Sequence, residues 1–163
     1  MKVVIISDIH DNIESLKICL NWSNKKNADM IICCGDVGKY KTLNILASLF
    51  KKDIILVKGN AEIYDEEELL SFDNIKYLGK YGSFELDNKN VGVCHEPYYI
   101  TKVVESCTCD ILFYGHLHQP WDNIKSGVRS VNPGTLGDRF MPGTFAYWDT
   151  KNDEISLKIL NEL

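Results

Sequence analysis

The stretch Ile111-Leu112-Phe113-Tyr114-Gly115-His116-Leu117-His118 joins a short apolar run to a polar end. The apolar residues at its start predict a buried strand. In an extended chain, residues two apart project to the same side, so His116 and His118 are expected to point together. Neutral imidazole is a common nitrogen ligand for transition metals. Taken alone, the pair fits a metal site and an ordinary polar loop about equally well.

Four other apolar runs also end in Asp, Asn or His, and together the five endings use all four histidines of the chain. Ligands of open α/β sheets gather at the carboxyl ends of the strands. So many polar donors at one edge would be costly in an apolar interior without a partner. A metal takes about four to six such ligands, so seven donors that share a carboxylate indicate two metals. The seven candidate ligands are Asp8, His10, Asp36, Asn60, His95, His116 and His118.

The composition is that of an ordinary globular chain and predicts one domain over residues 1–163, with 45% hydrophobic and 25% charged residues. No apolar run is long enough to span a membrane. The first residues fit a strand better than a signal peptide, so a cytoplasmic location is expected. The net charge of −5 disfavours a broad nucleic-acid surface. An acidic chain can still bind phosphate where metal ions supply positive charge.

The order of apolar and amphipathic segments predicts an α/β fold. In the first half, strands alternate with helices, which favours parallel pairing with right-handed crossovers. The second half contains short strands joined partly by hairpins, so two mixed β-sheets packed as a sandwich and flanked by helices are expected. Strands are predicted at 3–6, 30–34, 54–57, 75–78, 83–86, 91–94, 111–114, 128–131, 144–148 and 155–160, helices at 12–25, 42–50, 65–70 and 99–107, and hairpin turns at 87–90 and 149–153.

The six cysteines do not form a Cys-x-x-Cys pair, which disfavours a structural zinc site. Cys33 and Cys34 lie together in an apolar run, where adjacent side chains face opposite ways. Buried thiols in a reducing compartment are therefore favoured over disulfides. The pair Cys107-x-Cys109 is the one for which a redox role is most worth testing.

The five endings, in this order, resemble the signature of the calcineurin-like metallophosphoesterase superfamily. That signature is Asp-x-His, Gly-Asp, Gly-Asn, His and Gly-His-x-His. Here it reads Asp8-Ile9-His10, Gly35-Asp36, Gly59-Asn60, His95 and Gly115-His116-Leu117-His118. The short chain and the segment Val131-Asn132-Pro133-Gly134-Thr135 resemble the compact bacterial and archaeal phosphodiesterase branch. The resemblance implies an αββα sandwich over nearly the whole chain.

The resemblance also implies a division of the ligands between two metals and a reaction. Asp8, His10 and His118 would hold the first metal, Asn60, His95 and His116 the second, and Asp36 would bridge them. Asp36, Asn60 and His95 are therefore also expected to be catalytic. Mn²⁺ is the expected cofactor, with Fe, Ni, Co or Zn as alternatives. The implied reaction is hydrolysis of a phosphodiester by in-line attack of a hydroxide held between the metals.

The chain departs from the family pattern at several positions. Ala61 stands where many relatives have a histidine that assists the leaving group, and Glu62 is a weak candidate to replace it. Glu96 follows His95 where the small branch often has glycine and a second histidine. Asp138 and Arg139 match no known motif, and for Arg139 a surface position is favoured over a phosphate clamp. Asp11 or Asn12 is expected to cap the following helix rather than to contact substrate.

Three functions remain open at this point. A phosphodiesterase acting on a small phosphoester is favoured. The second interpretation is a phosphomonoesterase or nucleotide pyrophosphatase that uses the same site. A non-catalytic protein-binding scaffold, such as the retromer subunit of this fold, is the third, although all seven ligands are retained here. No membrane partner is expected. The oligomeric state is left open, with a dimer as one option.

Overall fold

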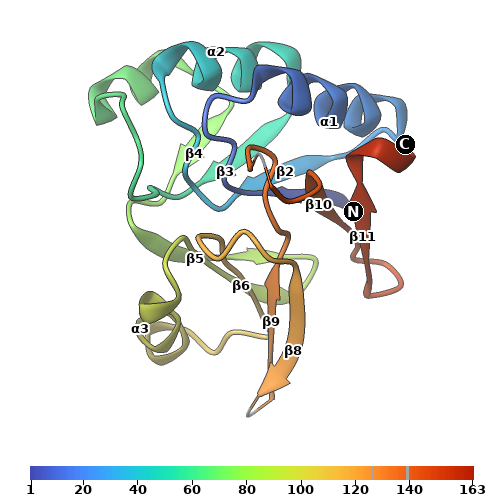
Figure 1. Cartoon of the computed structure of the whole chain (residues 1–163). Helices are drawn as coiled ribbons and strands as arrows, with labels where there is room; N and C mark the ends of the chain where they lie inside the picture. Colours follow the sequence, from blue (N-terminus) through green and yellow to red (C-terminus); the bar gives the residue numbers. More distant parts are fainter. Residues whose placement is uncertain (126, 139) are drawn as a thin grey trace.

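The computed structural model describes residues 1–125, 127–138 and 140–163. Two β-sheets lie face to face, with α1 (Ile13–Lys25) and α2 (Tyr40–Leu49) over the outer face of one sheet and α3 (Ile100–Ser106) beside the other (Figure 1). This is the αββα sandwich predicted from the sequence, and the prediction is confirmed. Among the described residues, no helix has the length and apolar character needed to cross a membrane.

The first sheet has six strands in the order β11-β10-β1-β2-β3-β4. β1 to β4 run parallel, with α1 and α2 as crossovers between β1, β2 and β3, while β10 pairs antiparallel with β1. The parallel arrangement brings the carboxyl ends of β1, β2 and β3 to the same edge. The strands are β1 (Lys2–Ile6), β2 (Met30–Cys33), β3 (Asp53–Leu56), β4 (Ile75–Tyr77), β10 (Thr144–Asp149) and β11 (Glu154–Ile159).

The second sheet has five strands in the order β5-β6-β7-β9-β8. β6 and β7 are parallel, so their carboxyl ends also share an edge. The strands are β5 (Tyr81–Leu86), β6 (Lys89–Cys94), β7 (Ile111–Phe113), β8 (Trp121–Lys125) and β9 (Val128–Asn132). Among the residues that the structure describes, there are also three 3₁₀ helices, at Glu66–Ser71, Pro97–Tyr99 and Leu160–Glu162.

Along the buried strands, successive side chains face opposite sides of the sheet, and this divides the core into layers. In β1, Val3 and Ile5 pack between the two sheets with residues of β6 and β7, whereas Val4 and Ile6 pack under α1 and α2. A third, smaller cluster lies between the second sheet and α3. Because β1 is buried on both faces, it reads as a continuous apolar run, as central parallel strands do.

Two local predictions were incomplete. β8 was missed because its sequence, Trp121-Asp122-Asn123-Ile124-Lys125, has no apolar run; it is an edge strand held by antiparallel pairing with β9. The acidic helix predicted at 65–70 is the 3₁₀ turn Glu66–Ser71, which begins with a capping box between Asp65 and Glu68.

Both predicted hairpins are present, the first as a two-residue turn at Asp87 and Asn88.

The prediction that all cysteines are free thiols was wrong for one pair. Cys107 and Cys109 form a disulfide across the turn between α3 and β7, with their Cα atoms 5.4 Å apart. Their Cα separation lies within the usual disulfide range. The other four cysteines are free and buried, and burial raises the pKa of Cys19 to about 12.

Candidate metal centre

The seven candidate ligands lie at the edge where both sheets present the carboxyl ends of their strands. Asp8 and His10 follow β1, Asp36 follows β2, and Asn60 follows β3 in the first sheet. In the second sheet His95 follows β6, and the two remaining histidines follow β7. Contacts between their side chains, given below, join all seven into one cluster. The sandwich therefore assembles residues that are as far apart in the chain as Asp8 and His118.

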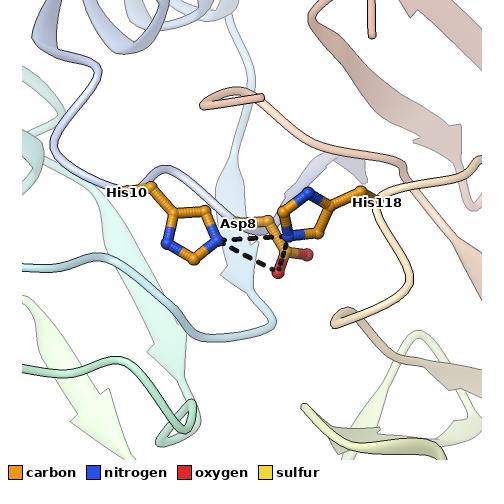
Figure 2. A group of neighbouring side chains, drawn as sticks. All are labelled: Asp8, His10 and His118. Carbon is orange, nitrogen blue, oxygen red and sulfur yellow. Dashed lines mark hydrogen bonds and ion pairs between the residues drawn. The ribbon is translucent and has the colours of Figure 1, made fainter. Parts of the chain in front are cut away.

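One group of donors consists of Asp8, His10 and His118 (Figure 2). The Nε2 atom of His10 lies 3.7 Å from Asp8 Oδ1, and that of His118 lies 3.3 Å from the same oxygen. The two Nε2 atoms are 3.2 Å apart. Three ligand atoms thus converge on one small volume.

A second group consists of Asn60, His95 and His116. The amide oxygen of Asn60 lies 3.1 Å from His95 Nε2 and 2.8 Å from His116 Nδ1. The Nδ1 atom of His95 donates a hydrogen bond of 2.7 Å to the main-chain carbonyl of Cys34. Since a carbonyl only accepts, this bond assigns the proton to Nδ1 and leaves the Nε2 lone pair facing the cluster.

Asp36 lies between the two groups. Its Oδ2 atom is 3.6 Å from His10 Nε2 and 3.2 Å from His95 Nε2. Its other oxygen accepts a hydrogen bond of 2.8 Å from the main-chain N–H of Ala61. Asp8 Oδ1 is 4.0 Å from His95 Nε2, so Asp36 makes the shorter contact with the second group, a position suited to a shared ligand.

The donor atoms fit divalent cations. Asp8 Oδ1 is buried and has no hydrogen-bond partner among the described residues, although an unpaired buried carboxylate oxygen is costly. Two imidazole nitrogens 3.2 Å apart also need a proton or a cation between them. Mixed oxygen and nitrogen donors suit first-row transition metals. The floor of the cluster is formed by buried Asp8, Asp36 and His95, and its rim by exposed His10, Asn60 and His116 with half-buried His118.

Charge coupling shifts the pKa values of several members of the cluster. The pKa of His10 is raised, first by the nearby carboxylate of Asp8, whose Oδ1 lies 3.7 Å from His10 Nε2. Burial lowers the pKa of His95, but the carboxylate of Asp36 outweighs burial and the net shift is upward. Burial raises the pKa of Asp36, and His95 outweighs it so that the net shift is downward. The carboxylates thus favour the protonated form of His10 and of His95, and cation binding would compete with those protons.

The backbone is left-handed at many of these positions. Asp8, Asp36, His116 and His118 have φ angles of 53°, 53°, 71° and 57°, and His10 has 45°. Such conformations cost on the order of 1–3 kcal/mol each in residues other than glycine and are concentrated at functional sites. The premise of an extended chain at His116 and His118 was therefore wrong, although both side chains reach the cluster. The left-handed turns send His116 to Asn60 and His118 to Asp8.

Two glycines leave room for the site. A Cβ on Gly59 would lie 2.0 Å from Asp36 Oδ1, and one on Gly115 would lie 2.0 Å from Ser7 Oγ and 3.0 Å from Asp8 Oδ2. Neither position has space for a side chain. The glycine of the Gly-Asn dipeptide therefore allows its loop to pass close to Asp36, and the glycine of the Gly-His dipeptide allows its loop to pass close to Asp8.

Glu62 connects two of the loops. Its carboxylate accepts hydrogen bonds from the main-chain N–H groups of Val37, Gly38 and Gly59, at 3.2, 3.0 and 3.3 Å. Burial raises its pKa, whereas these three hydrogen bonds act to lower it. Both oxygens are thus occupied in joining the loops after β2 and β3, which is a structural alternative to the role of proton donor, for which Glu62 is only a weak candidate.

The structure also places three of the four remaining candidate residues. Asn12 caps α1, as predicted, by accepting a hydrogen bond from Ser15 N, while Asp11 accepts one from Lys39 N in the next loop. Asp138 lies against His118, a contact that no local spacing in the sequence indicates. Arg139, expected at the surface, lies outside the described residues.

Comparison with known proteins identifies the family and the fold of the chain. The model of the calcineurin-like phosphoesterase superfamily domain matches residues 1–153. The phosphodiesterase MJ0936 of Methanocaldococcus jannaschii is 24% identical over 139 residues, covering 82% of this chain and 83% of that protein. A solved archaeal phosphodiesterase superposes with a TM-score of 0.86 at 23% identity, covering 98% of this chain and 99% of the other. Vps29 of Entamoeba histolytica complexed with zinc has a TM-score of 0.69 at 19% identity, covering 97% of this chain and 96% of the other.

Proposed function

Because the chain belongs to the calcineurin-like phosphoesterase superfamily and is a hydrolase of phosphoric esters, we propose that it is a metal-dependent phosphodiesterase acting on a small diester. The observation that supports this most directly is the pair of donor groups on either side of Asp36. One buried carboxylate between two sets of imidazole and amide donors is the arrangement expected for two cations side by side.

The proposed ligand sets follow these contacts. Asp8, His10 and His118 hold one cation, Asn60, His95 and His116 hold the other, and Asp36 contacts both. We propose Mn²⁺ as the native cation, with Fe, Ni, Co and Zn as the alternatives to test. When bound, the two cations would supply positive charge against the phosphoryl oxygens and a nucleophile from water at neutral pH.

The protein residues contribute position, burial and charge. The buried carboxylates of Asp8 and Asp36 provide the negative charge that attracts cations to this site. The rim residues His10, Asn60 and His116 are exposed and border the space from which a phosphoester would enter. The left-handed loops hold these donors in place before substrate binds, so that little reorganisation is required during the reaction.

Metal removal and return test the proposal. Protein stripped with a chelator is expected to lose hydrolysis of bis-p-nitrophenyl phosphate, and added Mn²⁺ is expected to restore it. The measurement is kcat/KM for this diester, for p-nitrophenyl phosphate and for dinucleotides with each candidate metal. Greater activity on the monoester or on dinucleotides would replace the diesterase with a phosphomonoesterase or pyrophosphatase. No turnover with any metal would favour a protein-binding scaffold.

The absence of a histidine after Asn60 leads to a second prediction. Ala61 offers no proton to a leaving alcohol, and general acid catalysis typically supplies ~10²–10⁴-fold. We expect Ala61→His to raise kcat for diesters with alkyl leaving groups more than for bis-p-nitrophenyl phosphate, whose leaving group needs little protonation. Ala61→Gln, of similar length but without an acid, is the control. An equal gain on both kinds of ester would mean that proton donation is not limiting.

A further inference from the structure

Asp138 lies on the far side of the His118 ring from the metal-ligand cluster. His118 Nδ1 donates a hydrogen bond of 2.8 Å to Asp138 Oδ2. The opposite ring nitrogen, Nε2, lies 3.3 Å from Asp8 Oδ1 and 3.2 Å from His10 Nε2. The imidazole thus bridges a carboxylate outside the cluster and the donor atoms inside it.

The loop that carries Asp138 is built on the main chain of Asp8. Thr135 is fully buried, and its hydroxyl donates a hydrogen bond of 2.9 Å to the carbonyl of Asp8. The same hydroxyl accepts from the N–H groups of Gly137 and Asp138, at 3.0 and 3.1 Å. Gly137 N also donates to the Asp8 carbonyl at 2.8 Å. These hydrogen bonds fix the position of Asp138 relative to Asp8, and the ring of His118 lies between the side chains of these two residues.

The contacts of Asp138 leave one oxygen for the histidine. Its Oδ1 accepts a hydrogen bond of 2.7 Å from the main-chain N–H of Phe140, and Oδ2 faces His118. Because Asp138 Oδ2 accepts this hydrogen bond, Nδ1 of His118 carries a ring proton, and in the neutral imidazole the lone pair is then on Nε2.

We propose that Asp138 is a positioning residue, which holds His118 in the Nδ1–H tautomer so that Nε2 can bind the cation shared with Asp8 and His10. The inference rests on the proposed metal site. It gives His118 the same tautomer that the Cys34 carbonyl imposes on His95. His95 uses a main-chain group that mutation cannot remove, whereas His118 depends on a side chain, so the effect can be tested. Outer partners of this kind typically change metal affinity by about 10–100-fold.

The experiment compares Asp138→Ala and Asp138→Asn with the wild type. In metal-free protein above pH 8, long-range ¹H–¹⁵N spectra report the tautomer of His118, assigned with His118→Ala. We expect the Nδ1–H tautomer in the wild type and in Asp138→Asn, whose amide oxygen still accepts, and the Nε2–H tautomer to gain population in Asp138→Ala. Calorimetric titration with Mn²⁺ is expected to show about 100-fold weaker binding at one site in Asp138→Ala and about 10-fold in Asp138→Asn.

The control is Asp73→Asn, an exposed aspartate before β4 at the opposite edge of the sheet, for which wild-type tautomer and affinity are expected. Wild-type tautomer and wild-type Mn²⁺ affinity in Asp138→Ala would overturn the inference. Should Asp138→Ala fail to fold, wild-type affinity in Asp138→Asn would overturn it in the same way. Because neither readout uses hydrolysis, a protein without phosphodiesterase activity would refute the proposed function and leave the role of Asp138 to be decided by these data.

Discussion

Replacing His116 by alanine is expected to lower kcat/KM for bis-p-nitrophenyl phosphate by about 10³-fold, at a Mn²⁺ concentration that saturates the wild type. The imidazole lies on the exposed rim with Nδ1 2.8 Å from Asn60 Oδ1, so its loss removes a donor from one of the two proposed cation sites. A catalytic metal supplies several kcal/mol of transition-state stabilisation, and about 4 kcal/mol corresponds to about 10³-fold in rate. Because the side chain is exposed, the fold is expected to remain intact.

The control for His116→Ala is Leu117→Ala, which truncates the adjacent side chain, itself 55% exposed. We expect wild-type unfolding temperatures in both variants, near wild-type activity in Leu117→Ala, and a lower bound-metal content in His116→Ala by elemental analysis. Asn60→Ala removes the neighbouring donor and is expected to behave like His116→Ala. Undiminished turnover in both His116→Ala and Asn60→Ala would contradict the assignment of the second site.

Replacing Gly59 by alanine is expected to destabilise the metal-free protein by about 3 kcal/mol, at the upper end of the usual cost of overpacking. The added methyl group would lie 2.0 Å from Asp36 Oδ1 and 2.3 Å from Asp36 N, in a contact between two loops. Relief requires the loop after β3 to move away from that after β2, which separates Asn60 from Asp36. Metal binding is therefore expected to weaken together with stability. Chemical denaturation of the metal-free protein, followed by Mn²⁺ titration, measures both effects.

The matched control for Gly59→Ala is Gly79→Ala. Gly79 has a φ angle of +74° but nothing within 4 Å of an added Cβ, so only the cost of a left-handed residue applies, about 1 kcal/mol. Metal affinity is expected to stay at the wild-type value in this variant. Equal destabilisation by the two substitutions would show that the space over Asp36 is not limiting, and would remove the steric argument for glycine in the Gly-Asn motif.

Much of the fold and the composition of the candidate site could be predicted from the sequence, because both are encoded locally. An apolar run such as residues 3–6 is buried on both faces, and the polar residue after it must lie at the edge of the sheet. Asp8, Asp36, Asn60 and His95 could be named together on this ground alone. β8 could not be found, because pairing with β9 holds it rather than an apolar pattern of its own.

The sequence by itself therefore determined which side chains gather at one edge, since strand burial and strand direction depend on short stretches of chain. Only the tertiary structure decided what each one contacts. His116 and His118 diverge because their backbones are left-handed, Asp138 reaches His118 because its loop is hydrogen-bonded to the main chain of Asp8, and Glu62 accepts from two separate loops. These contacts depend on loops from distant parts of the chain packing against each other, and no local propensity encodes that packing.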